Sequence, residues 1–315
     1  MRTGRMRRRL RRAFKEARDA VVGTLAVGLL RLLRHTNPDR MADFAGWSMR
    51  KIGPLLREHQ IARGNLRLAF PEKSPAEIEI ILSGSWDNLG RMAAEFAHLD
   101  KLWDYDPAHP ERPARFEFSN QAIKRFAELA NDGQPALVFA AHLANWEMPG
   151  ICAATYGLDS AVLYRRPNIP RIDRWIAETR GASMGELIST GLHAPVKLAD
   201  ALRRGAHVGM LVDQYYVRGV PVTFFGRRTM ANPLIARLAR HFDCPIYGVR
   251  IIRLPGNRFS GEITKAIAPA RDEEGKVDVA ATMQTITSVV EGWVREHPEQ
   301  WLWQHRRWRP EDEGL

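Results

Sequence analysis

The pattern of apolar and polar positions changes character near residue 114. Between residues 40 and 100 the apolar side chains recur at helical spacing, which predicts helices throughout that stretch. Beyond residue 114, short apolar runs bounded by glycine or proline alternate with helical segments. These runs predict strands at residues 136–140, 161–164, 208–212, 246–252 and 259–267.

The order of these elements predicts the architecture. Strands that alternate with helices are typical of a mostly parallel sheet covered by helices. The last two strands flank a turn at Pro255–Asn257, which indicates an antiparallel hairpin at one edge. We therefore expect an α/β fold with a mostly parallel mixed sheet flanked by helices, preceded by a helical N-terminal segment. The expected units are a helical region 35–113 and a core 114–315, which together form one compact domain.

Helix boundaries are signalled most clearly after Ser74. Ser74 and Glu77 match a capping box, and Pro75 stands at the first helical position. This predicts a helix from Ser74 toward Leu82, with a further helix over 86–99. The other helices are expected at 61–70, 119–131, 145–156, 171–180, 195–204, 233–242 and 277–296.

Residues 1–34 are a basic, amphipathic segment. Nine Lys or Arg stand against two acids in residues 1–19, and the apolar run 20–30 follows. As a helix that run would be roughly 17 Å long, too short for a hydrocarbon core of about 30 Å. A signal peptide would need a small-residue cleavage site, which the sequence does not show clearly. We expect an uncleaved helix that lies in or dips into the cytoplasmic leaflet, the alternative being a solvated basic tail before an ordinary helix.

Charge and cysteine usage narrow the class of protein. The chain has 315 residues and a formal net charge of +11, which favours anionic partners such as nucleic acid, acidic lipid or an acidic protein. Its two cysteines, Cys152 and Cys244, are far apart in the sequence and have no metal-ligand spacing. This usage suits a reducing compartment without a disulfide framework.

Polar side chains stand at the ends of three predicted strands. His142 follows the first strand directly, Arg165 and Arg166 follow the second, and Asp213 follows the third. Strand ends of an α/β sheet usually form the ligand site, so these residues can converge on one cleft. His142 and Glu147 could then be a base and its orienting carboxylate. The alternative, about equally favoured by the pattern alone, is a structural histidine beside a first-turn glutamate.

The motifs resemble one enzyme family. H-L-A-N-W-E (142–147) is similar to the H-x-x-x-x-[DE] motif of glycerolipid acyltransferases. Further blocks narrow the resemblance to the late, lauroyl/myristoyl-type acyltransferases of lipid A biosynthesis. They are N-L-R-L-A-F-P (65–71), Y-R-R-P-N (164–168), D-Q (213–214), V-T-F-F-G (222–226) and E-Q-W-L-W-Q-H-R-R-W (299–308).

The resemblance implies a bacterial inner-membrane enzyme that faces the cytoplasm. The implied donor is a fatty acyl chain on acyl carrier protein. The implied acceptor is a hydroxyl on a 3-hydroxyacyl chain of an anionic, Kdo-bearing lipid A precursor. No cofactor, metal or nucleic acid is implied. Another glycolipid, such as a mannoside, or a lysophospholipid is the alternative acceptor.

The resemblance also implies roles for individual residues. His142 and Glu147 match the catalytic pair of the family motif, and Arg166 matches its arginine before proline. Asp213, together with Arg165 and Asn145, is assigned to substrate binding. The family often has histidine after the aspartate, whereas this chain has Gln214, which leaves that position without an implied role.

The expected chemistry is direct acyl transfer. A neutral imidazole can take the proton of an acceptor hydroxyl as it attacks a thioester, a contribution of roughly 10²–10⁴-fold. Glu147 would orient the ring, while Arg166 or backbone amides would bind the oxyanion. For Asp213 we expect contact with Arg166 or the acceptor, the alternative being a helix cap or loop salt bridge. A nucleic-acid-binding protein and a metallohydrolase using His142, Glu147 and Asp213 are the competing classes.

Overall fold

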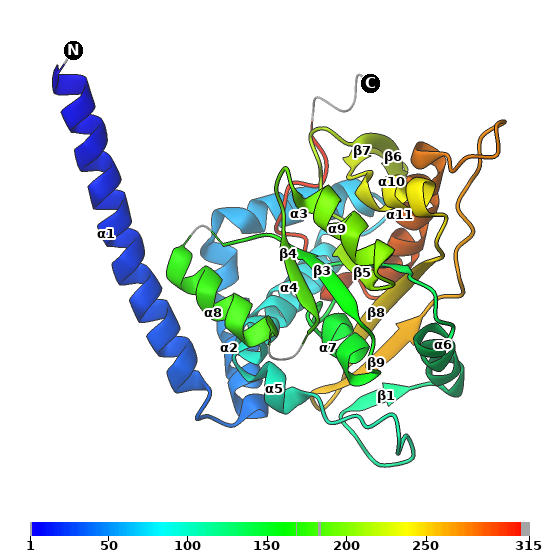
Figure 1. Cartoon of the computed structure of the whole chain (residues 1–315). Coiled ribbons are helices and arrows are strands. Elements are labelled where there is room, and N and C mark those ends of the chain that lie inside the picture. The colour runs from blue at the N-terminus through cyan, green and yellow to red at the C-terminus, as the bar shows by residue number, and fades with distance from the viewer. Residues whose placement is uncertain (1, 168, 182–183, 310–315) are drawn as a thin grey trace.

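The computed structural model describes residues 2–167, 169–181 and 184–309, with the side chains of residues 2–13 and 15 excepted. Asn168 of the Y-R-R-P-N motif, residues 310–315 and the basic side chains before Phe14 therefore lie outside the description. A central sheet carries helices on both faces, and α1 runs as a long rod along one side of the molecule (Figure 1).

The main sheet has seven strands in the order β1-β9-β8-β2-β5-β3-β4. All neighbours are parallel except β8 and β9, which form the predicted antiparallel hairpin. The predicted α/β class is therefore confirmed. The strands are β1 (Phe116–Phe118), β2 (Leu137–Ala140), β3 (Ser160–Tyr164), β4 (Glu186–Ser189), β5 (His207–Leu211), β8 (Ile246–Leu254) and β9 (Arg258–Ile263). A separate antiparallel hairpin consists of β6 (Val220–Phe224) and β7 (Arg227–Ala231).

The helices before the core pack as a group. They are α1 (Arg2–Leu33), α2 (Pro38–Ile52), α3 (Arg57–Ala69), α4 (Pro75–Glu95) and α5 (Leu99–Leu102), with short 3₁₀ turns η1 (Gly53–Leu55) and η2 (Phe96–His98). The capping box forms as predicted, since Ser74 and Glu77 exchange both hydrogen bonds. The prediction of two helices over 74–99 is wrong, because α4 is continuous. Gly90 lies against the Ala45 carbonyl, where an added Cβ would stand 2.4 Å away, so α2 packs closely on an unbroken α4.

The helices of the core connect the strands. They are α6 (Asn120–Asn131), α7 (Met148–Thr155), α8 (Pro170–Gly181), α9 (Ala194–Arg203), α10 (Leu234–Phe242) and α11 (Val279–Glu296), followed by the 3₁₀ turn η3 (Pro298–Gln300). The prediction of a first helical turn at 145–147 is wrong. Glu147 is the N-cap residue of α7, and Met148–Pro149 begin the helix. Residues 141–147 therefore form a loop at the end of β2.

The C-terminal segment is part of the core. Trp301 and Trp303 are fully buried, and Leu143 forms a β-bridge with Trp301. Asn65, from the N-terminal N-L-R-L-A-F-P motif, donates to the carbonyls of Trp303 (2.8 Å) and His305 (2.6 Å). Two motifs from opposite ends of the chain thus hold each other in place behind the sheet.

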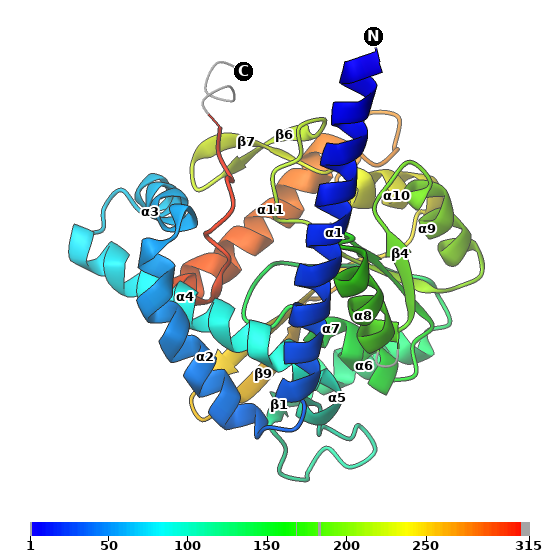
Figure 2. The same ribbon diagram turned by 90° about the vertical axis from the view of Figure 1, so that its left-hand side faces the viewer.

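Helix α1 is attached to the rest of the protein over its second half. It packs on α8 where Gly23 meets Ile169 and Arg171, and Arg34 forms an ion pair with Asp100. Figure 2 shows α1 and α2 on the same side of the molecule. Of the helices within the described residues, none is both long enough and apolar enough to cross a bilayer.

Candidate active site

His142 is oriented by Asp213. Nδ1 of His142 lies 2.8 Å from Oδ1 of Asp213, and the backbone N–H of His142 donates to Oδ2 over 2.9 Å. The indole N–H of Trp301 donates to the same oxygen over 2.7 Å. The side chain of Asp213 is fully buried, so this carboxylate is held by three donors in a site closed to water.

The charge on Asp213 sets the tautomer of the histidine. Burial by itself would raise the pKa of Asp213, but the adjacent His142 imidazole outweighs it and holds the pKa of that carboxyl well below its usual range. The ionised carboxylate accepts a hydrogen bond from Nδ1–H, which leaves the lone pair on Nε2 of His142. The side-chain amide of Gln214 lies 3.3 Å from that Nε2 atom. Nε2 is therefore the atom that can act as a base.

Sheet register explains why Asp213 meets His142. Strands β2 and β5 are parallel neighbours, and Ala140 is paired with Leu211. Two residues further along each strand stand His142 and Asp213. The prediction that Asp213 contacts Arg166 is therefore wrong, and so is the alternative of a helix cap: the carboxylate is bound by His142 and Trp301.

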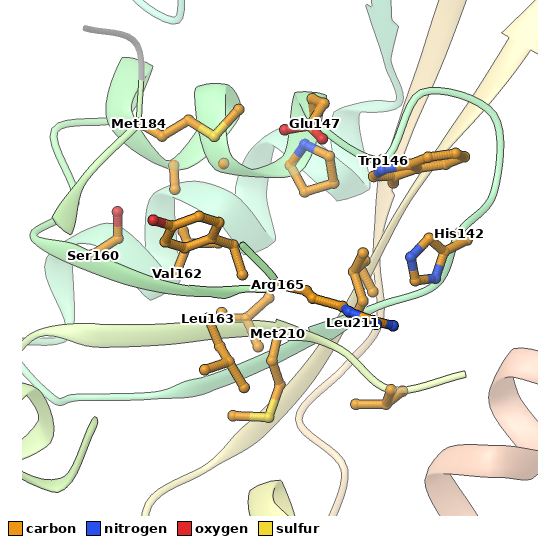
Figure 3. Close-up of a pocket in the computed structure, with 18 of the residues that line it drawn as sticks. His142, Trp146, Glu147, Ser160, Val162, Leu163, Arg165, Met184, Met210 and Leu211 are labelled. Carbon is orange, nitrogen blue, oxygen red and sulfur yellow. The ribbon is translucent and has the colours of Figure 1, made fainter. Parts of the chain in front are cut away.

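Glu147 does not take the orienting role that was expected of it. Its carboxylate forms a two-pronged ion pair with Arg180 of α8, with distances of 2.7 Å (Nε–Oε2) and 2.5 Å (Nη2–Oε1). Glu147 stands at the N-cap position of α7 without a side-chain capping bond, and its carboxylate accepts from Arg180 of α8 instead. Figure 3 shows Trp146 between Glu147 and His142 in that view. The Trp146 ring contacts the imidazole instead, at 5.0 Å between centroids. Because Glu147 faces Arg180 and not His142, the residues His142, Glu147 and Asp213 do not form a metal-ligand set among the described residues.

A cavity of about 500 Å³ opens beside His142. The loop of His142, Trp146 and Glu147 borders it, and apolar side chains of β2, β3 and β5 form its walls. Figure 3 shows Val162, Leu163, Met210 and Leu211 along these walls. The site therefore places the proton-accepting nitrogen of His142 beside a mainly apolar cavity.

Arg165, Arg166 and Arg180 differ in where they stand relative to this cavity. Arg166 pairs with Asp173 (2.7 Å) and its side chain remains 63% exposed. Arg165 and Arg180 line the cavity itself. The role of Arg180 was not predicted from the sequence, because the residue lies within a helix, 33 positions beyond its partner Glu147 and outside every quoted motif. Its guanidinium also lies over the ring of Tyr164, at 5.6 Å.

Asn145 supports the loop. Its side-chain amide donates to Glu95 over 2.8 Å, and its oxygen accepts from the backbone N–H of Glu147 over 3.2 Å. Glu95 in turn forms an ion pair with Arg253 of β8. Both polar ends of the Asn145 side chain are thus occupied inside the protein, which corrects its expected place among the substrate contacts.

The loop is also bound by the C-terminal segment. Ala144 has a positive φ of 47°, a strained conformation for a residue with a Cβ. The Ala144 N–H donates to the carbonyl of Gln300 (2.9 Å), and the Leu302 N–H donates to that of His142 (3.0 Å). These backbone bonds hold the loop in place, so residues 300–302 fix the position of the imidazole.

Comparison with known proteins gives a consistent result. The family model for bacterial lipid A biosynthesis acyltransferase matches residues 9–310. The chain is 26% identical over 267 residues to the lipid A biosynthesis palmitoleoyltransferase of Escherichia coli (strain K12), covering 82% of this chain and 81% of that protein. The lipid A biosynthesis acyltransferase of Shigella flexneri matches to the same extent.

Proposed function

Because the chain belongs to the bacterial lipid A biosynthesis acyltransferase family, we propose that it moves a fatty acyl chain from acyl carrier protein to a hydroxyl of a 3-hydroxyacyl chain on a Kdo-bearing lipid A precursor. Membership of this family establishes that the protein is an acyltransferase of lipid A biosynthesis. The identity of the acyl donor and of the acceptor is what we propose. The observation that carries it is the Asp213-oriented imidazole at the edge of an apolar cavity of about 500 Å³. A base beside a chamber for hydrocarbon is what acyl transfer requires.

His142 is the general base in this scheme. Its Nε2 takes the proton of the acceptor hydroxyl while the hydroxyl oxygen attacks the thioester carbonyl carbon. When the tetrahedral intermediate collapses, the carbon–sulfur bond breaks and the imidazolium returns its proton to the departing thiolate. Asp213 stabilises the imidazolium and keeps the ring in one tautomer, a role worth up to about 10⁴-fold in serine hydrolases.

Arg165 and Arg180 supply positive charge to the cavity. The Glu147 ion pair restrains Arg180, so its remaining donors are pre-positioned rather than mobile. We assign these two guanidinium groups to the tetrahedral oxyanion or to phosphate groups of donor and acceptor, since both carry negative charge in the reaction.

We further propose that α1 and α2 bind the cytoplasmic face of the inner membrane. An outer apolar surface, defined here as Leu25, Leu29 and Leu32 of α1 with Phe44 and Trp47 of α2, is exposed to solvent. Arg40, Arg50 and Lys51 are exposed on α2 as well. Aromatic and aliphatic side chains with flanking cations suit the boundary between headgroups and acyl chains of an anionic leaflet.

The direct test is acyl transfer by the purified full-length protein. Labelled acyl groups on acyl carrier protein are offered with a Kdo-bearing lipid A precursor, and the product is identified by mass spectrometry. Parallel reactions contain a mannoside glycolipid or a lysophospholipid as acceptor. The proposal predicts one added acyl chain, ester-linked to a 3-hydroxyacyl group of the lipid A precursor. Transfer to another acceptor alone would assign the enzyme to that acceptor.

A further inference from the structure

Two polar side chains lie at the end of the cavity far from His142. Ser160 begins β3 and His207 begins β5, and the two are paired in the parallel register of these strands. Both line the same cavity as His142. Figure 3 shows Ser160 and His142 at opposite ends, with apolar side chains between them. The exposed fractions are 4% for Ser160 and 8% for His207, so both side chains are buried.

The hydrogen bonding of both residues is incomplete. Nε2 of His207 lies 3.2 Å from the carbonyl oxygen of Leu129. A carbonyl can only accept, so Nε2 carries the proton and Nδ1 offers a lone pair. That Nδ1 atom and Oγ of Ser160 are buried without a hydrogen-bond partner among the described residues. Buried polar atoms are normally paired, so two unpaired atoms on one cavity wall mark a place where a polar group of a ligand can bind.

A hydroxyl satisfies both atoms at once. It can donate its proton to Nδ1 of His207 and accept one from the hydroxyl of Ser160. A methyl group can do neither, and it would keep water away from both atoms. The chemistry of this end of the cavity therefore differs from that of its walls, which are apolar.

We propose that Ser160 and His207 form a recognition site for a hydroxyl at or near the far end of the bound acyl chain. This rests on the proposed function only in placing an acyl chain in the cavity. Asp213 stands six positions after His207, just beyond the end of β5, which is a span of about 20 Å for an extended chain. An extended chain advances about 1.25 Å per carbon, from a bond of ~1.5 Å and an angle near 111°. The hydroxyl would thus sit about 16 carbons from the carbonyl.

Binding of free fatty acids tests this without relying on catalysis. Full-length protein is loaded with a fluorescent fatty acid, which is displaced by matched pairs of saturated acids from 12 to 18 carbons. One member of each pair ends in a methyl group and the other in a terminal hydroxyl. At short lengths the hydroxyl meets the apolar walls and weakens binding tenfold or more. At the length that reaches Ser160 and His207 the preference reverses, to roughly 3- to 10-fold tighter binding of the hydroxylated acid.

Variants assign the effect to these two residues. Ser160→Ala and His207→Phe should each reduce the reversal, and the double variant should abolish it at every length. Met210→Leu is the matched control, because it changes the same cavity without changing a hydrogen-bonding group. Ser160→Ala is nearly isosteric, so it keeps the test decisive if His207→Phe fails to fold.

A hydroxyl that weakens binding at all lengths in the wild-type protein would overturn the inference. So would a reversal that Ser160→Ala and His207→Phe leave unchanged in folded protein. The outcome is independent of the acceptor: a length-dependent reversal in a protein that fails to acylate the lipid A precursor would support this site while refuting the proposed function.

Discussion

The carboxylate of Asp213 lies 2.8 Å from Nδ1 of His142, although 71 residues separate the two in the chain. Glu147, which is much closer to His142 in the sequence, forms an ion pair with Arg180 instead. The proposed catalytic pair thus lies at the ends of two adjacent parallel strands and not within one motif. This relationship determines which substitutions should stop the reaction.

Asp213→Asn should lower acyl transfer about 10²–10⁴-fold in a folded protein. An amide in that position can donate to Nδ1, which places the histidine proton on Nε2 and removes the base. His142→Ala should lose about as much, and the double variant little more, because the two residues act as one unit. Labelled acyl transfer measures the rates, with circular dichroism as the folding control. Near-normal activity in folded Asp213→Asn protein would contradict this assignment.

Glu147→Gln should reduce activity less than Asp213→Asn, because it leaves the His142–Asp213 pair intact. Its main effect should be on stability. Removing one charge from a buried ion pair leaves the other uncompensated, and such losses run to about 3–5 kcal/mol. Because the pair is largely buried, denaturant unfolding should show a loss of free energy of unfolding toward that range. The double variant Arg180→Met, Glu147→Gln should recover part of this lost stability. A folded Glu147→Gln protein that is as inactive as Asp213→Asn would return Glu147 to the catalytic role.

Arg165 and Arg166 are neighbours in the loop after β3, so substitutions of the two can be compared directly. The motif match alone predicts that Arg166→Ala is the more damaging substitution. The structure places Arg165 at the cavity and Arg166 on Asp173, so we expect Arg165→Ala to lower kcat/KM for transfer at least tenfold and Arg166→Ala to cost only a fewfold. Steady-state kinetics on both variants decide the order. Equal, mild losses would mean that the loop is basic surface.

Membrane binding should depend on both α1 and α2. Deleting residues 1–34 removes the α1 part of the outer apolar surface and should weaken binding to anionic vesicles at least tenfold. Trp47→Glu should weaken it severalfold, since it places a charge where an aromatic ring meets the headgroups. Leu192→Glu is the control, an equally drastic change at an exposed leucine outside α1 and α2. If Leu192→Glu weakens vesicle binding as much as Trp47→Glu does, a different surface faces the membrane.

His305 should make the protein less stable in acid. Burial lowers the pKa of His305 to about 4, and its ring packs on Trp301. Since the folded-state pKa lies below the unfolded value near 6.5, the unfolded chain binds more protons between these pH values. Stability is therefore highest above pH 6.5 and falls as the pH approaches 4, by about 3 kcal/mol at most.

Denaturant titrations at several pH values test this, with His305→Asn expected to flatten the decline. Asparagine can still donate to the Leu302 carbonyl that Nδ1 of His305 contacts at 2.7 Å. The exposed His109 provides the control, and His109→Asn should leave the pH dependence unchanged. A decline that is just as steep in His305→Asn would assign it to other groups.

Much of the core could be predicted because its strands are short apolar runs with clear boundaries. The convergence of His142 and Asp213 follows from strand order once β2 and β5 are neighbours. Their direct contact could not be predicted, because it depends on a register that no local pattern encodes. The orienting role was assigned to Glu147 because closeness in sequence suggested closeness in space, whereas its carboxylate is paired with Arg180.

Other elements escaped prediction for different reasons. β1 has three residues with a glutamate in the middle, and β4 has only two apolar residues, Leu187 and Ile188, so neither forms an apolar run like those that marked the other strands. The β6–β7 hairpin contains Pro221, which argues against a strand in general but is tolerated in this two-stranded ribbon. The continuity of α4 across Gly84 and Gly90 was not predicted, and both glycines allow a close approach, of Glu299 to Gly84 and of α2 to Gly90.

The bonds between residues 300–302 and the His142 loop have a consequence for how the enzyme is made. At ~5–20 residues per second, the ribosome reaches Trp301 roughly 8–30 s after His142. All strands of the sheet have been synthesised by then, but Asp213 still lacks its indole donor and the loop its backbone partners. The strands of the sheet are therefore made before the contacts that fix the proposed base, and a message cut short before Gln300 would encode a chain in which the His142 loop lacks those contacts.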